Sequence, residues 1–434
     1  MTDKKVLIIT YYWPPAGGAG VQRWLKFVKY LATMGYQSHV YTTSNPEAPA
    51  MDESLLKDIP NNAIIIKKPI KEPFGLYKKL TGKKGNFNAG FLSEEKKSKK
   101  GAMESLSMFI RANVFVPDAK MFWIRPSLRF LHEYIQKENI QTIISSGPPH
   151  SLHLIALRLK TKLNIKWIAD FRDPWTNIDF YKDLPMLSLV DRYQKKLEKK
   201  VLNQADRILV VGEQMKHEFQ AISPKSKIVV ITNGYDTEIK ENSSLDEKFS
   251  IVHIGSINAD RAHESFYQAI AELVEDQNAF KEHLSLKFVG KLDFVAKEYL
   301  EKYHLMPFAE IVQYLPYSQI GSLQQSARLL YLPINNTPNA KGILTGKFFE
   351  YMAAKRPILA QGPTDGDVAK ILGETKAGTI YGFNDISGLK KEILAQFKSY
   401  LKNEKYFESE KIEQYSRRNL SLKLKKLIDE TEAH

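Results

Sequence analysis

Residues 342–360 read GILTGKFFEYMAAKRPILA. The stretch begins as a polar, glycine-containing loop, continues as a short helical segment and ends in a strand that follows Pro357. Glu350 lies about one turn inside the helical segment, where its carboxylate can accept the two neighbouring hydroxyls of a ribose. The free amides around Thr345–Lys347 can face phosphate oxygens. This loop–helix–strand unit predicts an α/β fold with a ligand-binding loop.

Short β-branched runs alternate with helical patterns along the rest of the chain. Several runs are apolar throughout, as expected for parallel strands that helices cover on both faces. The predicted strands are Val6–Thr10, Ser38–Thr42, Ala63–Ile66, Thr142–Ser145, Trp167–Asp170, Ile208–Val211, Val229–Thr232, Ser250–Ile254, Leu286–Val289, Glu310–Tyr314, Leu329–Leu332, Ile358–Ala360 and Thr379–Tyr381. About thirteen strands are too many for one sheet. We therefore predict two doubly wound, Rossmann-like domains, which divide near the polar segment Tyr235–Phe249.

The composition limits the chemistry. The 434 residues include no cysteine, which excludes a disulfide scaffold, a thiolate nucleophile and cysteine-ligated metal sites. No stretch approaches the roughly 18 apolar residues that span a bilayer, and the N-terminus reads as a first buried strand rather than a signal peptide. A cytoplasmic location is expected. The net charge of +14 favours anionic partners such as phosphorylated substrates or an anionic membrane face.

One insertion is strongly basic. Residues 77–100 hold eight lysines with interleaved aromatic residues, and 103–115 carry apolar residues at helical spacing. Basic residues beside an apolar stripe suit an interfacial membrane contact, which predicts docking on the inner membrane face through residues 77–115. A solvated loop followed by an ordinary core helix fits the same pattern equally well.

Three more motifs follow predicted strands. Pro14–Gly20 (PPAGGAG) precedes a helix, so its glycines can bring backbone N–H groups close to a phosphate. His150 begins a helix at the edge of the sheet where open α/β sheets bind ligands. Asp170, Arg172 and Asp173 end another strand, where the arginine between the carboxylates argues against a metal site. In the second half, Gly255 begins a glycine turn that leads to Arg261, a cation able to bind a diphosphate.

Together these motifs resemble family 4 glycosyltransferases with the GT-B fold, of the kind found in bacterial polysaccharide assembly. The resemblance rests on six motifs in family order, namely Lys5–Pro15 with its glycine loop, Gly147–His150, Trp167–Trp175, Thr232–Asp236, Gly255–Arg261 and Gly346–Pro357. It implies two Rossmann-like domains facing across a cleft. The implied domains are 1–240 on the acceptor side with the basic insertion 77–100, 241–407 binding the nucleotide sugar, and a last helix, 408–434, packing back on the first domain.

The resemblance also implies roles for individual residues. Glu350 matches a ribose-binding glutamate, and Arg261 matches a cation near the donor diphosphate. Gly17 and Gly18 match a loop that approaches the donor phosphates, and His150 matches a histidine near the donor sugar, so His150 and Arg261 are the predicted catalytic residues. The other predicted donor-binding residues are Gly255, Lys347 and Leu315, and the predicted acceptor-side residues are Asp170, Arg172 and Asp173.

Two features depart from the family pattern. A second glutamate eight residues before the ribose-binding one is replaced by Gly342, and a second basic residue beyond Arg261 is missing. Lys291 or Lys347 could supply that charge. These departures leave open which group contacts the donor sugar.

The implied reaction is retaining transfer of a sugar from a nucleoside diphosphate sugar to a glycan or lipid-linked acceptor, without a metal or a further cofactor. Two alternatives remain: a sugar-nucleotide epimerase of the same fold, and a non-catalytic basic protein that binds a membrane or a partner. Nucleic acid is not an expected partner, because the sequence carries no recognisable RNA-binding motif.

Overall fold

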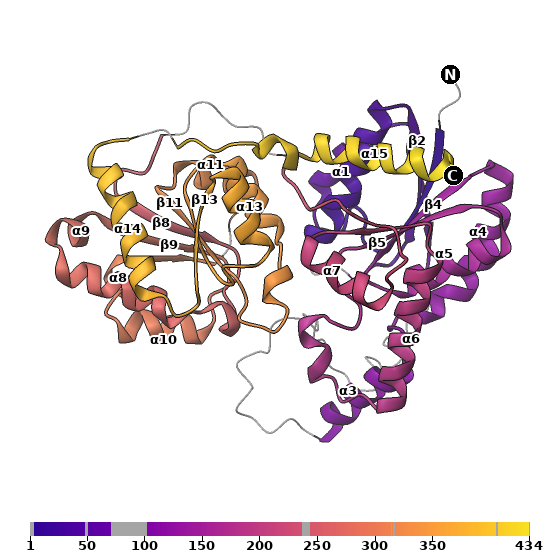
Figure 1. The fold of residues 1–434 in the computed structure, drawn as a ribbon, viewed down its shortest axis with the longest axis horizontal. Helices are drawn as coiled ribbons and strands as arrows, with labels where there is room; N and C mark the ends of the chain where they lie inside the picture. Colours follow the sequence, from indigo (N-terminus) through magenta and orange to yellow (C-terminus); the bar gives the residue numbers. More distant parts are fainter. Residues whose placement is uncertain are drawn as a thin grey trace. The chain divides into compact units, whose positions relative to one another are not determined.

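The computed structural model describes residues 4–47, 51–70, 102–236, 244–313, 315, 317–404 and 407–433 (Figure 1). The chain forms two compact units: Met1–Thr232 with Arg417–His434, and Asn233–Ser416. The lysine-rich insertion predicted at 77–100 lies outside the described residues. No helix of the described part of the chain combines the length and the apolar composition that would let it cross a membrane.

The first unit contains a seven-stranded parallel sheet in the order β3-β2-β1-β4-β5-β6-β7. Each of the seven strands predicted for this half is present among the described residues. Their bounds are β1 Lys4–Thr10, β2 Tyr36–Thr43, β3 Ile64–Lys68, β4 Thr142–Gly147, β5 Lys166–Phe171, β6 Arg207–Val210 and β7 Ile228–Val230. The helices of this unit are α1 Ala19–Thr33, α3 Ala102–Val114, α4 Ile124–Glu138, α5 Ser151–Lys162, α6 Ser188–Gln204, α7 Glu213–Ile222 and α15 Arg417–Ala433.

Helices cover both faces of this sheet. Alternate side chains of β1 point to opposite faces, so Leu7 and Ile9 pack with α4–α7, and Val6 and Ile8 pack with α1 and α15. The last helix, α15, contacts α1 and lies beside it in Figure 1. Because both faces are buried, the strands read as continuous apolar runs in the sequence.

The second unit contains a six-stranded parallel sheet in the order β10-β9-β8-β11-β12-β13. Its strands are β8 Phe249–Ile254, β9 Leu284–Val289, β10 Ala309–Val312, β11 Leu329–Pro333, β12 Ile358–Gln361 and β13 Gly378–Tyr381. Its helices are α8 Glu264–Asp276, α9 Asn278–His283, α10 Phe294–Lys302, α11 Tyr317–Ser326, α12 Gly346–Ala353, α13 Asp367–Thr375 and α14 Ile386–Leu401. One face packs on α12 and α13, and the other packs on α8, α9, α10 and α14.

Both sheets have the doubly wound order expected from the sequence. In each sheet, all strands are parallel, but the direction in which successive strands are added reverses once. The reversal falls between β1 and β4 in the first unit, and between β8 and β11 in the second. Open α/β sheets bind ligands outside the carboxyl ends of the strands at such a reversal. The loops after these four strands are therefore the places to look for a site.

Candidate functional site

The predicted site residues fall into two groups, one in each unit. In the second unit, Gly255 follows β8 with φ +119°, a backbone conformation that favours glycine. Gly290 follows the neighbouring strand β9 with φ +127°, and a Cβ there would lie 2.6 Å from the carbonyl oxygen of Gly255. The two strand ends approach each other too closely for larger residues. Because Gly255 has no Cβ, the side chain of Lys347 can occupy the space beside it.

Lys347 lies in the first turn of α12, and its ammonium sits against Gly255. Burial and the nearby Arg261 guanidinium lower the pKa of Lys347 to about 7, although Glu350 acts in the opposite direction. Lys347 makes no ion pair within the described part of the chain. The buried ammonium of Lys347 and the guanidinium of Arg261 repel each other, so an anion bound between them would be stabilised.

Arg261 is held in place by its own unit. Its Nε donates to Oδ1 of Asn335, and its Nη1 lies 3.4 Å from the carbonyl oxygen of Ser256. Asn335 follows β11, and Ser256 follows β8, so the guanidinium is anchored to both strands at the reversal of the sheet. Sequence reasoning missed Asn335, although its place just after a strand was the available signal.

The N-terminus of α12 completes this group. Thr345 is the N-cap residue, but no side chain caps the helix. The first amides of α12 are therefore available to an anion, and the helix dipole adds partial positive charge. Glu350 lies one turn further along and is half-buried. On the same face of the helix as Lys347, the Tyr351 hydroxyl accepts a hydrogen bond of 2.8 Å from the backbone N–H of Ile254, which fixes α12 to β8.

Leu315 and Gly342 are the remaining predicted positions of this unit. Leu315 is half-buried against the core cluster that contains α12. Its neighbours Tyr314 and Pro316 lie outside the described residues. Gly342 ends a short 3-10 turn, Ala340–Gly342, before α12. No carboxylate can come from that position.

In the first unit, the glycine loop after β1 meets Arg172. Gly18 has φ +102° and is the N-cap residue of α1, which has no side-chain cap. A Cβ at Gly20 would overlap the guanidinium of Arg172. Arg172 donates to the carbonyl oxygens of Gly147 and Pro148 and lies over the Tyr12 ring at 5.6 Å. The structure therefore brings together the predicted loop of Gly17 and Gly18 and the predicted residue Arg172, whereas Asp173 is exposed after β5.

His150 lies in a buried aromatic group at the start of α5. Its ring stacks on Trp175, with 4.7 Å between centroids, and His153 stacks on Phe171 at 4.3 Å. Burial, together with the nearby His153 and Arg172, lowers the pKa of His150 well below its usual value. Burial lowers the pKa of His153 to about 3. Both imidazoles are therefore neutral at pH 7, and His153 was not singled out from the sequence.

Asp170 is part of a fully buried network. Its carboxylate accepts hydrogen bonds from Arg23 at 3.1 Å, Trp24 at 2.7 Å and Ser146 at 2.7 Å. Arg23 also donates to the carbonyl oxygens of Ile231 and Thr232. The network joins α1 to β4, β5 and the chain after β7. The predicted acceptor-side role of Asp170 stays a prediction, but its carboxylate has no exposed surface.

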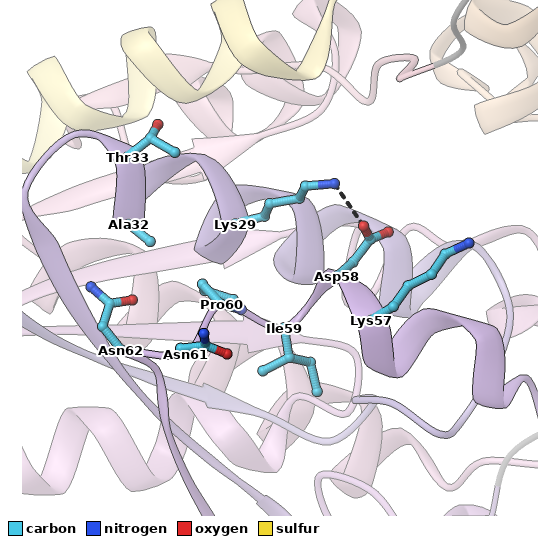
Figure 2. A pocket seen from close by; sticks show the side chains of 9 residues that line it. All are labelled: Lys29, Ala32, Thr33, Lys57, Asp58, Ile59, Pro60, Asn61 and Asn62. Carbon is cyan, nitrogen blue, oxygen red and sulfur yellow. Dashed lines mark hydrogen bonds and ion pairs between the residues drawn. The ribbon is translucent and has the colours of Figure 1, made fainter.

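A shallow hollow of about 450 Å³ lies elsewhere in the first unit (Figure 2). It is formed by the end of α1 and the segment before β3, where Lys29 pairs with Asp58 at 2.6 Å. These elements meet where the strands begin, not where they end. Among the described residues, no group of three or more His, Cys, Asp or Glu side chains could hold a metal ion.

Residues 102–239 match the family model described as Glycosyltransferase Family 4. This matched part, less than half of the chain, is similar to glycosyltransferase family 4. The match supports the resemblance found in the sequence, and its range includes the predicted site residues His150, Asp170, Arg172 and Asp173 described above. No curated protein is similar enough in sequence to count as a relative.

Solved structures of similar fold match almost the whole chain. A sucrose-phosphate synthase from Thermosynechococcus elongatus is 14% identical with a TM-score of 0.63, and a glycosyltransferase from Rickettsia africae is 13% identical with a TM-score of 0.62. HepE from Anabaena, solved in complex with UDP, is 10% identical with a TM-score of 0.57. Each comparison covers 99% of both chains. Together with the two parallel sheets, these structures confirm the two-domain GT-B fold.

Proposed function

We propose that this chain is a retaining glycosyltransferase that moves a sugar from a nucleoside diphosphate sugar to a glycan or lipid-linked acceptor. The observation that carries the proposal is the group formed by Gly255, Arg261, Lys347 and Glu350 at the sheet reversal of the second unit. Two cations and the uncapped N-terminus of α12 are suited to a diphosphate, and Glu350 is suited to the ribose. Anabaena HepE, which has the same fold, binds UDP.

The chemical step requires that the negative charge of the leaving diphosphate be neutralised as the glycosidic bond breaks. Arg261, Lys347 and the amides of α12 supply that neutralisation in the second unit. The acceptor hydroxyl attacks from the leaving-group face, and the leaving phosphate takes its proton. No enzyme nucleophile and no metal ion take part in this proposal. In this proposal, the donor sugar and the acceptor are contacted by residues of the first unit, namely His150, Arg172 and the loop of Gly17 and Gly18.

We also propose a cytoplasmic enzyme that docks on the inner membrane face to reach a lipid-linked acceptor in polysaccharide synthesis. The support comes from α3 and the start of α6, which lie side by side in Figure 1. Asn113 of α3 donates a hydrogen bond of 2.8 Å to the carbonyl oxygen of Pro185 and accepts one of 2.7 Å from the backbone N–H of Leu187, just before α6. Their large apolar side chains are exposed, which an ordinary core helix would not show. We call this the α3–α6 surface: Leu106, Phe109, Ile110, Val114, Leu187, Leu189 and Tyr193.

The α3–α6 surface also carries positive charge. The exposed face of α6 adds basic residues, namely Arg192, Lys195, Lys196, Lys199 and Lys200. Apolar side chains next to basic ones suit an anionic lipid surface. The apolar side chains enter the boundary of the acyl chains, and the basic side chains contact the anionic headgroups. The neighbouring lysine-rich insertion 77–100, outside the described residues, would add to the same attraction.

Isothermal titration tests the donor site. UDP, GDP and ADP are titrated into the wild type, Glu350→Ala and the control Glu298→Ala, whose side chain is exposed on α10. We expect one nucleotide to bind the wild type and Glu298→Ala, and to bind Glu350→Ala at least tenfold more weakly, because the lost hydrogen bonds to ribose involve a charged group. If no nucleotide binds the wild type, or Glu350→Ala binds as well as the wild type, the donor-site assignment is wrong. If incubation with the donor alone gives an epimerised sugar, the chain is an epimerase and the proposed sugar transfer is wrong.

A further inference from the structure

Two imidazole nitrogens of the first unit face the same point in the core. Nδ1 of His150 and Nε2 of His153 are buried and have no hydrogen-bond partner among the described residues. A Cβ at Gly147 would lie 3.1 Å from the first nitrogen and 2.5 Å from the second. Only glycine at the end of β4 lets the two rings approach in this way. Buried polar atoms without partners are uncommon, so this pair calls for an explanation.

The proton of His153 can be placed from its other contacts. Nδ1 of His153 lies 2.8 Å from the Ser145 hydroxyl, which also accepts a hydrogen bond of 2.9 Å from the Trp167 indole N–H. Ser145 is fully buried and its hydroxyl has one proton to donate. His153 Nδ1 is the acceptor available to that proton. The proton of the neutral His153 ring is therefore on Nε2, the nitrogen that faces His150.

We propose that His153 is a positioning residue that keeps the proton of His150 on Nε2. The N–H of His153 and Nδ1 of His150 border the same small space beside Gly147, where the positive end of that N–H favours the tautomer in which Nδ1 carries a lone pair. The stacked rings of Trp175 and Phe171 hold both imidazoles in this orientation. The chain of groups from Trp167 through Ser145 and His153 thus determines which nitrogen of His150 is a donor.

The consequence rests on the proposed function. In a sugar transferase, a neutral His150 with a proton on Nε2 donates a hydrogen bond to a hydroxyl of the donor sugar, and it keeps doing so across the neutral pH range. A His150 whose tautomer is mixed would present a donor only part of the time. Loss of His153 should therefore lower kcat more than it raises KM for the donor.

Long-range ¹H–¹⁵N spectra of the full chain, labelled with ¹⁵N-histidine, test the inference. In the wild type, His150 should show a neutral ring with the proton on Nε2, unchanged between pH 6 and 8. In His153→Phe, which can still stack on Phe171, and in Ser145→Ala, which keeps the His153 ring, the His150 signals should move toward a mixture of tautomers. His132→Phe, a change in α4 outside the cluster, should leave them as in the wild type.

Two outcomes would overturn the proposal. One is a wild-type His150 with its proton on Nδ1. The other is a His150 whose signals stay the same in His153→Phe and Ser145→Ala. If one of the two variants does not fold, the other variant and the wild-type spectrum still test whether His153 sets the tautomer of His150. The spectra are recorded without nucleotide sugar, so the result does not depend on whether the chain transfers sugars.

Discussion

The ammonium of Lys347 occupies the space in which a side chain at Gly255 would begin. The two residues are 92 positions apart, on the β8 end and the α12 start. The φ of +119° at Gly255 and the missing Cβ together let the lysine reach the sheet edge. The donor site proposed here thus depends on a glycine that touches the cation directly.

Gly255→Ala should abolish nucleotide binding. The new methyl group displaces the Lys347 ammonium, and the strained backbone costs about 1–3 kcal/mol of unfolding free energy. Titration with the tightest-binding nucleoside diphosphate measures the first effect and urea unfolding measures the second. Gly373→Ala in α13, where a Cβ meets nothing within 4 Å, is the control and should bind normally. Normal binding by a folded Gly255→Ala variant would contradict the account.

Nucleotide binding should weaken as pH rises above 7. The pKa of Lys347 is lowered to about 7 in the free protein, and a bound diphosphate stabilises the charged ammonium, so binding takes up a proton. The affinity should fall by up to about tenfold per pH unit above 7, where only the protonated form binds well. Titrations at pH 7.5–9 in buffers of different ionisation enthalpy give the affinity and the number of protons taken up.

Lys347→Arg provides the matched control for that pH dependence. Its guanidinium stays charged over the whole range, so the variant should take up no proton and show a flat profile. Equal slopes for the wild type and Lys347→Arg would show that another group titrates. Arg261 lowers and Glu350 raises the pKa of Lys347, and Lys347 in turn lowers the pKa of the buried His253.

Asp170→Ala should destabilise the first unit strongly. The substitution leaves the buried Arg23 guanidinium without its counter-charge, and removing one partner of a buried ion pair costs about 3–5 kcal/mol. Urea unfolding followed by circular dichroism measures the loss. Glu430→Ala breaks an exposed pair with Lys426 and should change stability by less than about 1 kcal/mol. Similar midpoints for the two variants would refute the assigned role of Asp170.

The α3–α6 surface should bind anionic vesicles. The wild type should sediment with phosphatidylglycerol vesicles. Leu106→Ser combined with Phe109→Ser should weaken binding by about tenfold or more, because two exposed apolar side chains that the lipid would bury are lost. Phe294→Ser, at an exposed apolar position of the second unit, is the control and should bind like the wild type. Equal binding by the double variant, or equal binding to phosphatidylcholine vesicles, would contradict membrane docking.

Much of the fold was predictable, because a parallel strand that is buried on both faces appears in the sequence as a continuous apolar run. The apolar runs of β1 and β8 predict these two strands. The glycines that follow each run indicate where the strand ends and which residues are candidates for binding the donor. What local pattern could not give is the partner of each polar side chain. Asp170 meets Arg23, 147 positions away, and His153 faces His150 only because both rings fold over Gly147.

The exposed apolar face of α3 was also ambiguous in the sequence. A helical stripe of Leu106, Phe109 and Ile110 fits a core helix as well as a docking helix. The structure leaves these side chains exposed, which does not fit a core helix, and membrane docking stays a prediction.

The most direct test of the central claim is a crystal structure of the chain with its tightest-binding nucleoside diphosphate. The account predicts the diphosphate within hydrogen-bond distance of Arg261, Lys347 and the first amides of α12, with the ribose hydroxyls on Glu350. Nucleotide density in another place, such as the hollow beside Lys29 and Asp58, with Lys347 still against Gly255 and no ligand near it, would contradict it.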